Sequence, residues 1–229
     1  MNLTIRKIEQ KLHNILKKGQ LLPLLEFIEK VPPKKLITPL IRSFYKEDSI
    51  QRWLAITAFG KVVAKIAKED MEQARIIMRR LMWSLNDESG GIGWGAPEAM
   101  AEAMANSKEL ANEYARILLS YVWEDGNFLE YLPLRRGALW GLYRLSKTQP
   151  DIFKNIKASD IVGQYISDND PISKALAMLA ISYSGDRRFC EKIAQNISNK
   201  NSVTLFIDYD LKKISISDIA KKALKKLNC

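Results

Sequence analysis

The sequence is poor in the residues on which most active sites and metal sites depend. Its 229 residues include one histidine, His13, and two cysteines, Cys190 and Cys229. A single histidine excludes histidine-clustered metal sites within one chain, and a Ser-His-Asp triad or a Cys-His dyad would have to use His13, which we expect to be a surface or partly packed residue. Two cysteines cannot build a disulfide framework or a cysteine zinc site, and we expect Cys190 to be a free cytosolic thiol. The sequence therefore offers neither an obvious nucleophile nor a metal centre.

Glycine, proline and long apolar runs are also scarce. The chain has 11 glycines and 8 prolines, and no apolar run approaches the ~18 residues that a membrane-spanning helix needs. Met1 is followed directly by a charged segment rather than by an apolar leader. With 47% apolar residues the chain can bury a substantial core. We therefore expect a folded, cytoplasmic protein.

A helical phrase recurs four times, at steps of 45, 38 and 39 residues. Each copy places small residues three positions apart on one helical face, beside a larger apolar neighbour. Small residues on one face let a partner helix approach closely, so the phrase predicts stacked helix pairs. The copies are Arg52-x-x-Ala55-x-x-Ala58-Phe59, Pro97-x-x-Met100-x-x-Ala103-Met104, Arg135-x-x-Ala138-x-x-Gly141-Leu142 and Lys174-x-x-Ala177-x-x-Ala180-Ile181.

The predicted helices follow this repeat. Two short amphipathic helices, over 3–17 and 21–30, are separated by Gly19 and stopped by Pro32 and Pro33. Four helix pairs follow, over 35–45 with 50–67, 71–85 with a helix from Ala96, 109–123 with 134–147, and 159–166 with 172–182. The sequence therefore predicts one elongated all-α domain, a right-handed α-solenoid with cap helices in 1–33, four helix pairs in 34–185 and a C-terminal cap in 186–229.

The sequence changes character after Gly185. Residues 187–197 still look helical, but 202–207 are β-branched and aromatic. A turn at 208–210 would lead into Lys213–Ile216 and complete a small β-hairpin, after which Ser217 and Asp218 would cap a last helix through Leu227. We expect the hairpin and helix to cover the open end of the stack.

The alanine- and glycine-rich faces, each following a turn acid and a basic residue, resemble the HEAT-repeat consensus. They are most similar to the short HEAT-like repeats first recognised in phycobilisome lyase subunits, although Pro97 replaces the basic residue in the second pair. The run from Ser84 to Met100, which contains GGIGWGAPEAM, looks like the signature of a small prokaryotic family of HEAT-like proteins, and 125–130 with 134–141 extends it. That family has no assigned activity, so the resemblance implies a fold and no reaction. HEAT-like proteins in general bind proteins or nucleic acid along a curved face.

The segment Ser89–Gly95 contains four glycines around Ile92 and Trp94. Glycine loses more backbone freedom on folding than any other residue, so such a segment needs a reason. One reason is a positive φ angle or the close passage of a neighbouring helix; the other is an anion held at the start of the helix at Pro97. Residues 87–130 carry nine acids and two bases, which disfavours the anion.

The connections 86–96 and 124–133 both lie within helix pairs, so we expect them to be neighbours on one edge of the stack. Their aromatic rings and carboxylates would form a platform for a basic peptide, an amine or a partner helix. Alternatively, the aromatics fill a gap between imperfect repeats and the acids cap helix N-termini. The candidate partner-binding residues are Glu88, Gly91, Gly93, Trp94, Glu98, Asn127, Phe128, Glu130, Arg135 and Arg136.

We expect the basic residues that follow the predicted turns to make ion pairs within the fold rather than to bind a ligand. Arg135 and Arg136 fall in the first turn of their helix, where a cation is unfavourable without an anion nearby. In HEAT-type stacks such a residue commonly bonds the turn acid of an adjacent repeat. We therefore expect a ladder in which Arg52, Arg135 and Lys174 pair with turn acids, namely Asp48, then Asp125 or Glu130, then Asp168 or Asp170.

The net charge of +10 is concentrated at the two ends of the chain. Residues 1–68 carry 14 basic and 5 acidic side chains, and 191–229 carry 8 and 4. Such ends could bind nucleic acid through phosphate contacts, with affinity that falls steeply with salt. The lysines and arginines concerned are Lys34, Lys35, Arg42, Lys212, Lys213, Lys221 and Lys222.

The leading hypothesis is a non-catalytic scaffold or adaptor that binds a protein partner through its repeat edge or concave face, without a cofactor. Nucleic-acid binding by the basic ends is the alternative. An enzyme or a divalent-cation site using Glu88, Glu98 and Glu130 is a third hypothesis, which no residue spacing requires.

Overall fold

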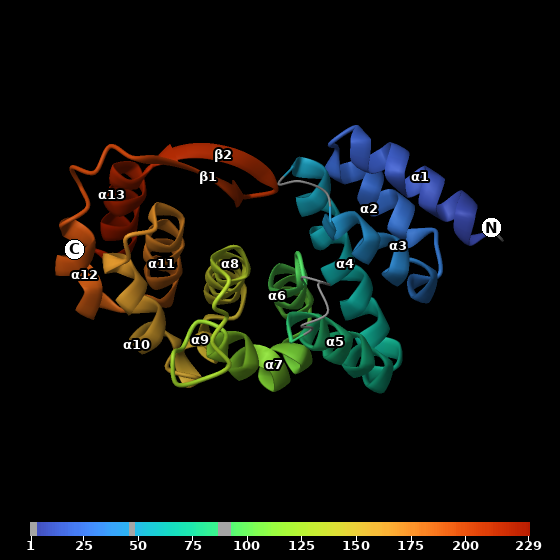
Figure 1. The fold of residues 1–229 in the computed structure, drawn as a ribbon, viewed down its shortest axis with the longest axis horizontal. Helices are drawn as coiled ribbons and strands as arrows, with labels where there is room; N and C mark the ends of the chain where they lie inside the picture. Colours follow the sequence, from blue (N-terminus) through green and yellow to red (C-terminus); the bar gives the residue numbers. More distant parts are fainter. Residues whose placement is uncertain (1–3, 46–48, 87–92) are drawn as a thin grey trace. The chain divides into compact units, whose positions relative to one another are not determined.

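The computed structural model describes residues 4–45, 49–86 and 93–229, most of which are helical (Figure 1). The chain divides into two compact units, Met1–Leu110 and Ala111–Cys229. The boundary falls inside one helix, α7 (Lys108–Ser120). The single elongated domain expected from the sequence stays a prediction.

The first unit contains six helices before α7 among its described residues. They are α1 (Ile5–Lys17), α2 (Leu21–Glu29), α3 (Ile37–Arg42), α4 (Ile50–Glu69), α5 (Met71–Leu85) and α6 (Ala96–Asn106). The predicted helices over 50–67 and 71–85 are confirmed to within two residues. The predicted helix over 35–45 is shorter, because Pro39 has no N–H to bond back to Lys35, and 3-10 turns flank α3 on both sides.

Helix α4 forms the core of the first unit. It packs against α1, α2, α3, α5 and α6, and most of its side chains are buried. Phe59 of α4 meets Phe44 edge to face, with ring centroids 5.3 Å apart. The recurring Ala55, Ala58 and Phe59 of the sequence phrase therefore line the packing face of this helix, as predicted.

Gly60 lies where α4 crosses α6. A Cβ at this position would lie 2.5 Å from the carbonyl carbon and 2.6 Å from the carbonyl oxygen of Glu102.

We expect Gly60→Ala to destabilise the first unit by about 1–3 kcal/mol, because the clash with backbone outweighs the gain of about 1 kcal/mol in helix propensity. Urea unfolding measures the change. Lys61→Ala, at the next position of α4, is the control, and a Gly60→Ala midpoint as high as that of the wild type would contradict the close crossing.

The second unit is built around α8 and α11, which pack against each other. Its elements after α7 are α8 (Leu132–Thr148), α9 (Pro150–Asn155), α10 (Ala158–Val162), α11 (Pro171–Ser184), α12 (Cys190–Ala194), β1 (Ser202–Ile207), β2 (Asp210–Ser215) and α13 (Ile216–Leu227). Helix α9, which was not predicted, begins with Pro150 at its first position. The predicted helices over 159–166 and 187–197 are each divided into a short α-helix and a 3-10 turn.

Arginine–carboxylate pairs connect the starts of the stacked helices within each unit. In the first unit Arg52 of α4 donates to Glu98 of α6 at 2.6 Å. In the second, Arg136 of α8 donates from Nε to Asp170, the N-cap of α11, at 3.0 Å. Burial favours the neutral form of Asp170, but hydrogen bonds from Arg136 and Ser173 outweigh this effect and lower its pKa. A basic residue at the start of one helix thus pairs with a carboxylate near the start of a neighbouring helix in both units, as the predicted ladder requires.

The ladder differs from the prediction in its members. Arg52 pairs with Glu98, whereas the predicted Asp48 lies outside the described residues. Arg136 takes the place predicted for Arg135, whose guanidinium bonds backbone carbonyl groups instead. Within the described residues Lys174 makes no ion pair. The prediction was wrong for Arg135 and for Lys174. For Arg135 the reason is that adjacent residues in a first helical turn point about 100° apart, so that Arg136 faces the neighbouring helix. The pair of Arg52 with Asp48 stays a prediction.

The C-terminal hairpin is confirmed, with a tighter turn than expected. Strands β1 and β2 pair antiparallel from Ser202 with Ser215 to Ile207 with Asp210. The turn consists of Asp208 and Tyr209, both with positive φ, which is the pattern of a type I′ hairpin turn. The hairpin is attached to the unit by Trp140, whose Nε1 donates to the carbonyl oxygen of Phe206 at 2.9 Å.

Helix α13 packs on α11 and α12 through its apolar face. Its N-cap is Ser215, whose hydroxyl accepts from the N–H of Asp218 at 3.0 Å, rather than the predicted Ser217. The opposite face exposes lysines at 221, 222, 225 and 226. Exposed lysines opposite a buried apolar face are typical of surface helices, so nucleic-acid binding stays a prediction.

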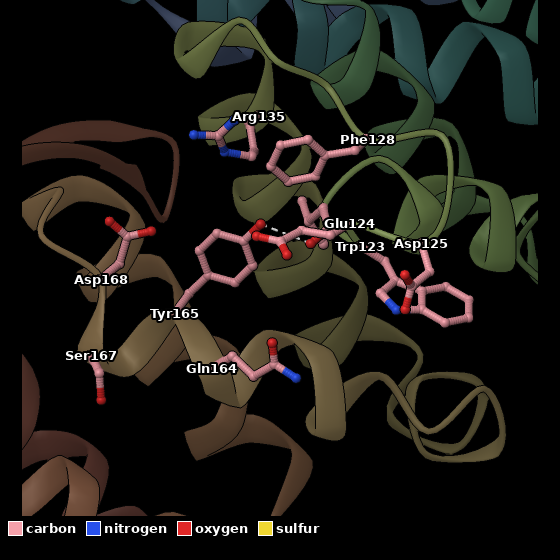
Figure 2. Close-up of a pocket in the computed structure, with 10 residues that line it drawn as sticks. Trp123, Glu124, Asp125, Phe128, Arg135, Gln164, Tyr165, Ser167 and Asp168 are labelled. Carbon is pink, nitrogen blue, oxygen red and sulfur yellow. Dashed lines mark hydrogen bonds between the residues drawn. The ribbon is translucent and has the colours of Figure 1, made fainter.

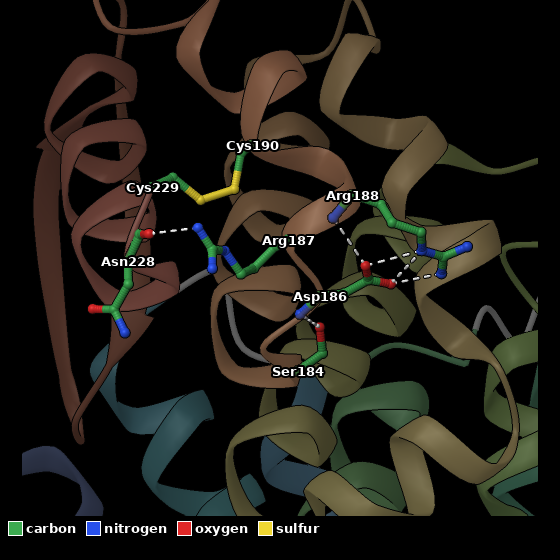
Figure 3. The surroundings of a disulfide bond; sticks show 7 residues. All are labelled: Ser184, Asp186, Arg187, Arg188, Cys190, Asn228 and Cys229. Atoms are coloured by element: carbon green, nitrogen blue, oxygen red, sulfur yellow. Dashed lines mark hydrogen bonds and ion pairs between the residues drawn. A yellow bond between two sulfur atoms is a disulfide. The ribbon is translucent and has the colours of Figure 1, made fainter.

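A disulfide joins Cys190, the first residue of α12, to Cys229, just beyond α13, with Cα atoms 6.2 Å apart (Figure 3). This corrects the expectation of a free thiol at Cys190, which was based on the low cysteine count and not on a spatial relation between the two residues. Arg187 donates to the backbone oxygen of Asn228 at 3.0 Å beside the disulfide. Covalent and polar contacts thus hold the end of α13 against the segment before α12.

Candidate functional site

A pocket of about 360 Å³ opens in the second unit (Figure 2). It lies between the segment that follows α7, the first turns of α8, and the 3-10 turn Gly163–Ser167 that precedes α11. Its lining residues are Val122, Trp123, Glu124, Asp125, Phe128, Arg135, Gln164, Tyr165, Ser167 and Asp168. All belong to one compact unit.

The segment after α7 folds back on the end of that helix. The N–H of Gly126 donates to the carbonyl oxygen of Trp123 at 2.9 Å, and the N–H of Leu129 to that of Tyr121 at 3.1 Å. Gly126 is required by close packing, because a Cβ there would lie 2.8 Å from the carbonyl oxygen of Ser120. This folding buries Leu129 and leaves Trp123 exposed.

Tyr165 forms the centre of the pocket wall. Its hydroxyl donates to the carbonyl oxygen of Val122 at 2.7 Å, which ties the turn before α11 to the end of α7. Burial raises the pKa of Tyr165 to about 12, with smaller effects from the charges of Arg135, Asp168 and Glu124. The phenol is neutral at ordinary pH with or without this shift, and the three charged groups lie close enough to act on it.

Arg135 is held by the wall of the pocket. Its Nη1 donates to the carbonyl oxygens of Leu129 at 2.8 Å and Glu130 at 3.2 Å. Its guanidinium lies over the ring of Phe128, 4.7 Å from the centroid. The positive charge of Arg135 is thus directed at backbone and at an aromatic face.

Three carboxylates surround the same pocket. Glu124 and Asp125 are exposed, while Asp168 is half-buried and accepts from the N–H of Asp170 at 2.8 Å. In the described part of the chain none of the three forms an ion pair with lysine or arginine. With three acids and one base, the pocket lining carries a net charge of −2. Figure 2 shows Glu124 and Asp168 on opposite sides of Tyr165.

Two of the predicted partner-binding residues in the first unit, Glu98 and Gly93, make close contacts within the fold. Glu98 is 3% exposed and paired with Arg52, so its carboxylate is inside the helix stack. Gly93 is buried, and a Cβ there would lie 2.7 Å from the carbonyl oxygen of Ser84. Trp94 is half-buried. Glu88 and Gly91 lie outside the described residues.

Gly95 adopts a positive φ of 75° immediately before α6. Together with the close approach of Gly93 to α5, this angle matches the conformational explanation for the glycine-rich segment, one of the two that the sequence left open. Because Trp94 and Phe128 belong to different units, the predicted joint platform of the two loops stays a prediction.

The predicted residues of the second unit divide between the pocket and its surroundings. Phe128 and Arg135 line the pocket. Asn127 donates to the hydroxyl of Ser120 at 3.1 Å, and Glu130 contributes a backbone carbonyl to Arg135. Arg136 is directed toward Asp170 and α11.

Trp123, Gln164, Tyr165 and Ser167 were not among the predicted site residues, and Glu124, Asp125 and Asp168 were predicted as turn residues only. The adjacent Trp123, Glu124 and Asp125 at a helix end were a usable local signal, because an aromatic beside two acids in a turn is suited to cation binding. No local signal marks Tyr165, which reaches the pocket through a contact 43 residues away in the sequence.

The described residues contain neither a cluster of metal-binding side chains nor a membrane-spanning helix. Across 4–45, 49–86 and 93–229, no three His, Cys, Asp or Glu side chains are grouped to hold a metal ion. No helix within those ranges combines the length and the apolar character needed to cross a membrane.

No family model matches the chain. An uncharacterized protein of Archaeoglobus fulgidus is 26% identical over 196 residues, which cover 84% of this chain and 95% of the relative. A designed armadillo repeat protein in complex with the peptide (KR)4 superposes with a TM-score of 0.57 and 16% identity, over 98% of this chain and 91% of that one. A second designed armadillo repeat protein gives 0.55 and 15%, over 98% and 92%. The chain thus has a helical-repeat fold of the armadillo type, completed by a C-terminal two-stranded hairpin and helix.

Proposed function

We propose that this chain is a non-catalytic helical-repeat scaffold that binds a protein partner through the pocket of its second unit. The observation that carries the proposal is an exposed tryptophan, Trp123, beside three carboxylates without ion-pair partners around one pocket. Among the described residues these carboxylates form no ion pair, so a basic group of a partner could pair with them without displacing one.

The composition of the pocket supports a protein ligand. Tryptophan, tyrosine and arginine are enriched among the residues that dominate binding energy at protein interfaces, and Trp123, Tyr165 and Arg135 lie together here. Trp123 is 44% exposed, and Tyr131, a few residues further along the same connection, is 46% exposed. Trp83 in the first unit is exposed as well, so the neighbouring carboxylates rather than exposure alone distinguish Trp123.

The repeat fold supports the same class of function. Stacked helical repeats present extended surfaces that bind other macromolecules, and one designed armadillo protein of similar fold was solved with a peptide. We also infer, from the recurring sequence phrases, that the chain belongs with the short HEAT-like repeat proteins. The paired Arg52 and Glu98, and Arg136 and Asp170, support that assignment.

The proposal predicts that Trp123→Ala will weaken partner binding about thirtyfold, because truncating an interface tryptophan typically removes about 2 kcal/mol or more. A partner recovered from native cells by the tagged chain would first be identified and purified, and its affinity then measured by calorimetry. The matched control is Trp83→Ala, which removes a tryptophan that is 79% exposed in the first unit.

If the Trp123→Ala and Trp83→Ala variants bound the partner with equal affinity, binding through the pocket would be contradicted. Circular dichroism of both variants checks that each keeps its helical fold. A partner lost equally by both variants would place the interface elsewhere.

A further inference from the structure

We propose that the pocket of the second unit holds a basic side chain, arginine or lysine, from an extended segment of the partner, an inference that rests on the proposed function. The four observations that carry it are the charge balance of the pocket, its free aromatic surface, its size and the charge of the whole chain.

The charge balance favours a cation. Glu124, Asp125 and Asp168 contribute three negative charges, and Arg135 contributes one positive charge that is directed at two backbone carbonyls and a ring. The acids therefore keep a net negative potential in a partly enclosed space. A basic side chain there would gain charge-assisted hydrogen bonds, whereas a phosphate or carboxylate would be repelled.

The aromatic surface adds a second interaction for the same ligand. The face of Phe128 is covered by Arg135, which already demonstrates cation binding by a ring of this pocket. Trp123 is exposed, and tryptophan is the aromatic residue that attracts a cation most strongly. Tyr165 is neutral at ordinary pH, as an unperturbed tyrosine also is, and burial raises its pKa further, to about 12, so it adds a ring without an additional charge.

The size of the pocket limits the occupant. A volume of about 360 Å³ is near the lower end of small-ligand pockets and suits one long side chain with the adjoining backbone. A folded domain cannot enter it. An extended basic segment places one such side chain in the pocket while its neighbours remain outside.

The positive net charge of the whole chain makes binding of a basic peptide a selective sign of a local acidic site. The net charge is +10, so a basic peptide is repelled at long range and gains affinity only from a local acidic site. Measurable binding of a basic peptide would therefore report on such a site rather than on general attraction.

The test uses the full chain and two fluorescein-labelled eight-residue peptides, one alternating arginine with serine and the other alternating citrulline with serine. Citrulline has nearly the shape of arginine without its charge. Fluorescence anisotropy is expected to show binding of the arginine peptide at least about tenfold tighter than that of the citrulline peptide, as loss of charged hydrogen bonds predicts.

A charge-matched pair of variants locates the site. Glu124→Gln with Asp168→Asn is expected to weaken the arginine peptide at least about tenfold. Glu191→Gln with Asp151→Asn changes the net charge equally at exposed positions of the same unit away from the pocket, and should leave binding unchanged. Asp168→Asn keeps an oxygen that can accept from the N–H of Asp170, so the fold is preserved.

The outcomes separate the inference from the proposed function. Equal binding of the two peptides, no binding of either, or equal loss in both double variants would overturn the basic occupant. Free agmatine binding as tightly as the arginine peptide would also overturn it, because the ligand would then be a small cation. If the purified partner still lost affinity with Trp123→Ala, the proposed function would stand without this inference.

Discussion

Replacing Arg52 by alanine is expected to destabilise the first unit by about 3–5 kcal/mol, the range for breaking a buried ion pair on one side. The side chains of Arg52 and Glu98 are 11% and 4% exposed, and they approach to 2.6 Å. Losing the arginine leaves a carboxylate inside the stack, where its charged form is poorly solvated. Urea unfolding followed by circular dichroism measures the loss.

Two further variants test whether the buried charge is the cause. Arg52→Met with Glu98→Met removes both charges and should lose less stability than Arg52→Ala, because apolar side chains of similar size can replace a buried pair. Arg42→Ala breaks the pair of Arg42 with Glu9, in which the arginine is 69% exposed, and should change stability by less than about 1 kcal/mol. Equal losses for Arg52→Ala and Arg42→Ala would contradict a buried pair.

Reducing the disulfide is expected to destabilise the second unit by about 4 kcal/mol, the loop-closure entropy for a cross-link of this span. Cys190 and Cys229 are separated by 39 residues, which include the hairpin and α13. The apolar face of α13 remains buried without the bond, so we expect lower stability rather than loss of fold.

Thermal unfolding with and without dithiothreitol measures the effect of the disulfide. Cys190→Ser with Cys229→Ser is the control, since its midpoint should be as low as that of the reduced wild type and should not respond to the reductant. Alkylation of the oxidised wild type without reductant is expected to label neither cysteine. Two labelled cysteines would contradict the bond.

The helical repeat could be predicted because it depends on residues that are close together in the sequence. The small residues at 55, 58, 177 and 180 recur at helical spacing, and the structure buries all four. The turn before Pro171 could be predicted equally well, since Asp170 caps α11 and Pro171 is its first residue. Helix periodicity and capping depend on residues a few positions apart, which a sequence shows directly.

The pocket and the disulfide depend on contacts between distant segments and were not predictable in the same way. Tyr165 is joined to Val122, and Cys190 to Cys229, across about 40 residues. The choice between Arg135 and Arg136 as the partner of Asp170 depended on the rotation of α8, which spacing alone left open. Local rules therefore identified the region around Phe128 and Arg135 but not its opposite wall.

Hydrogen–deuterium exchange of the full chain, with and without the arginine–serine peptide, shows which backbone amides are protected when the peptide binds. If the peptide occupies the pocket, we expect slower exchange in 121–128 and 163–168 in its presence, with no change at 202–215. Exchange that is unaltered around the pocket, or slowed in the hairpin alone, would contradict binding at this site.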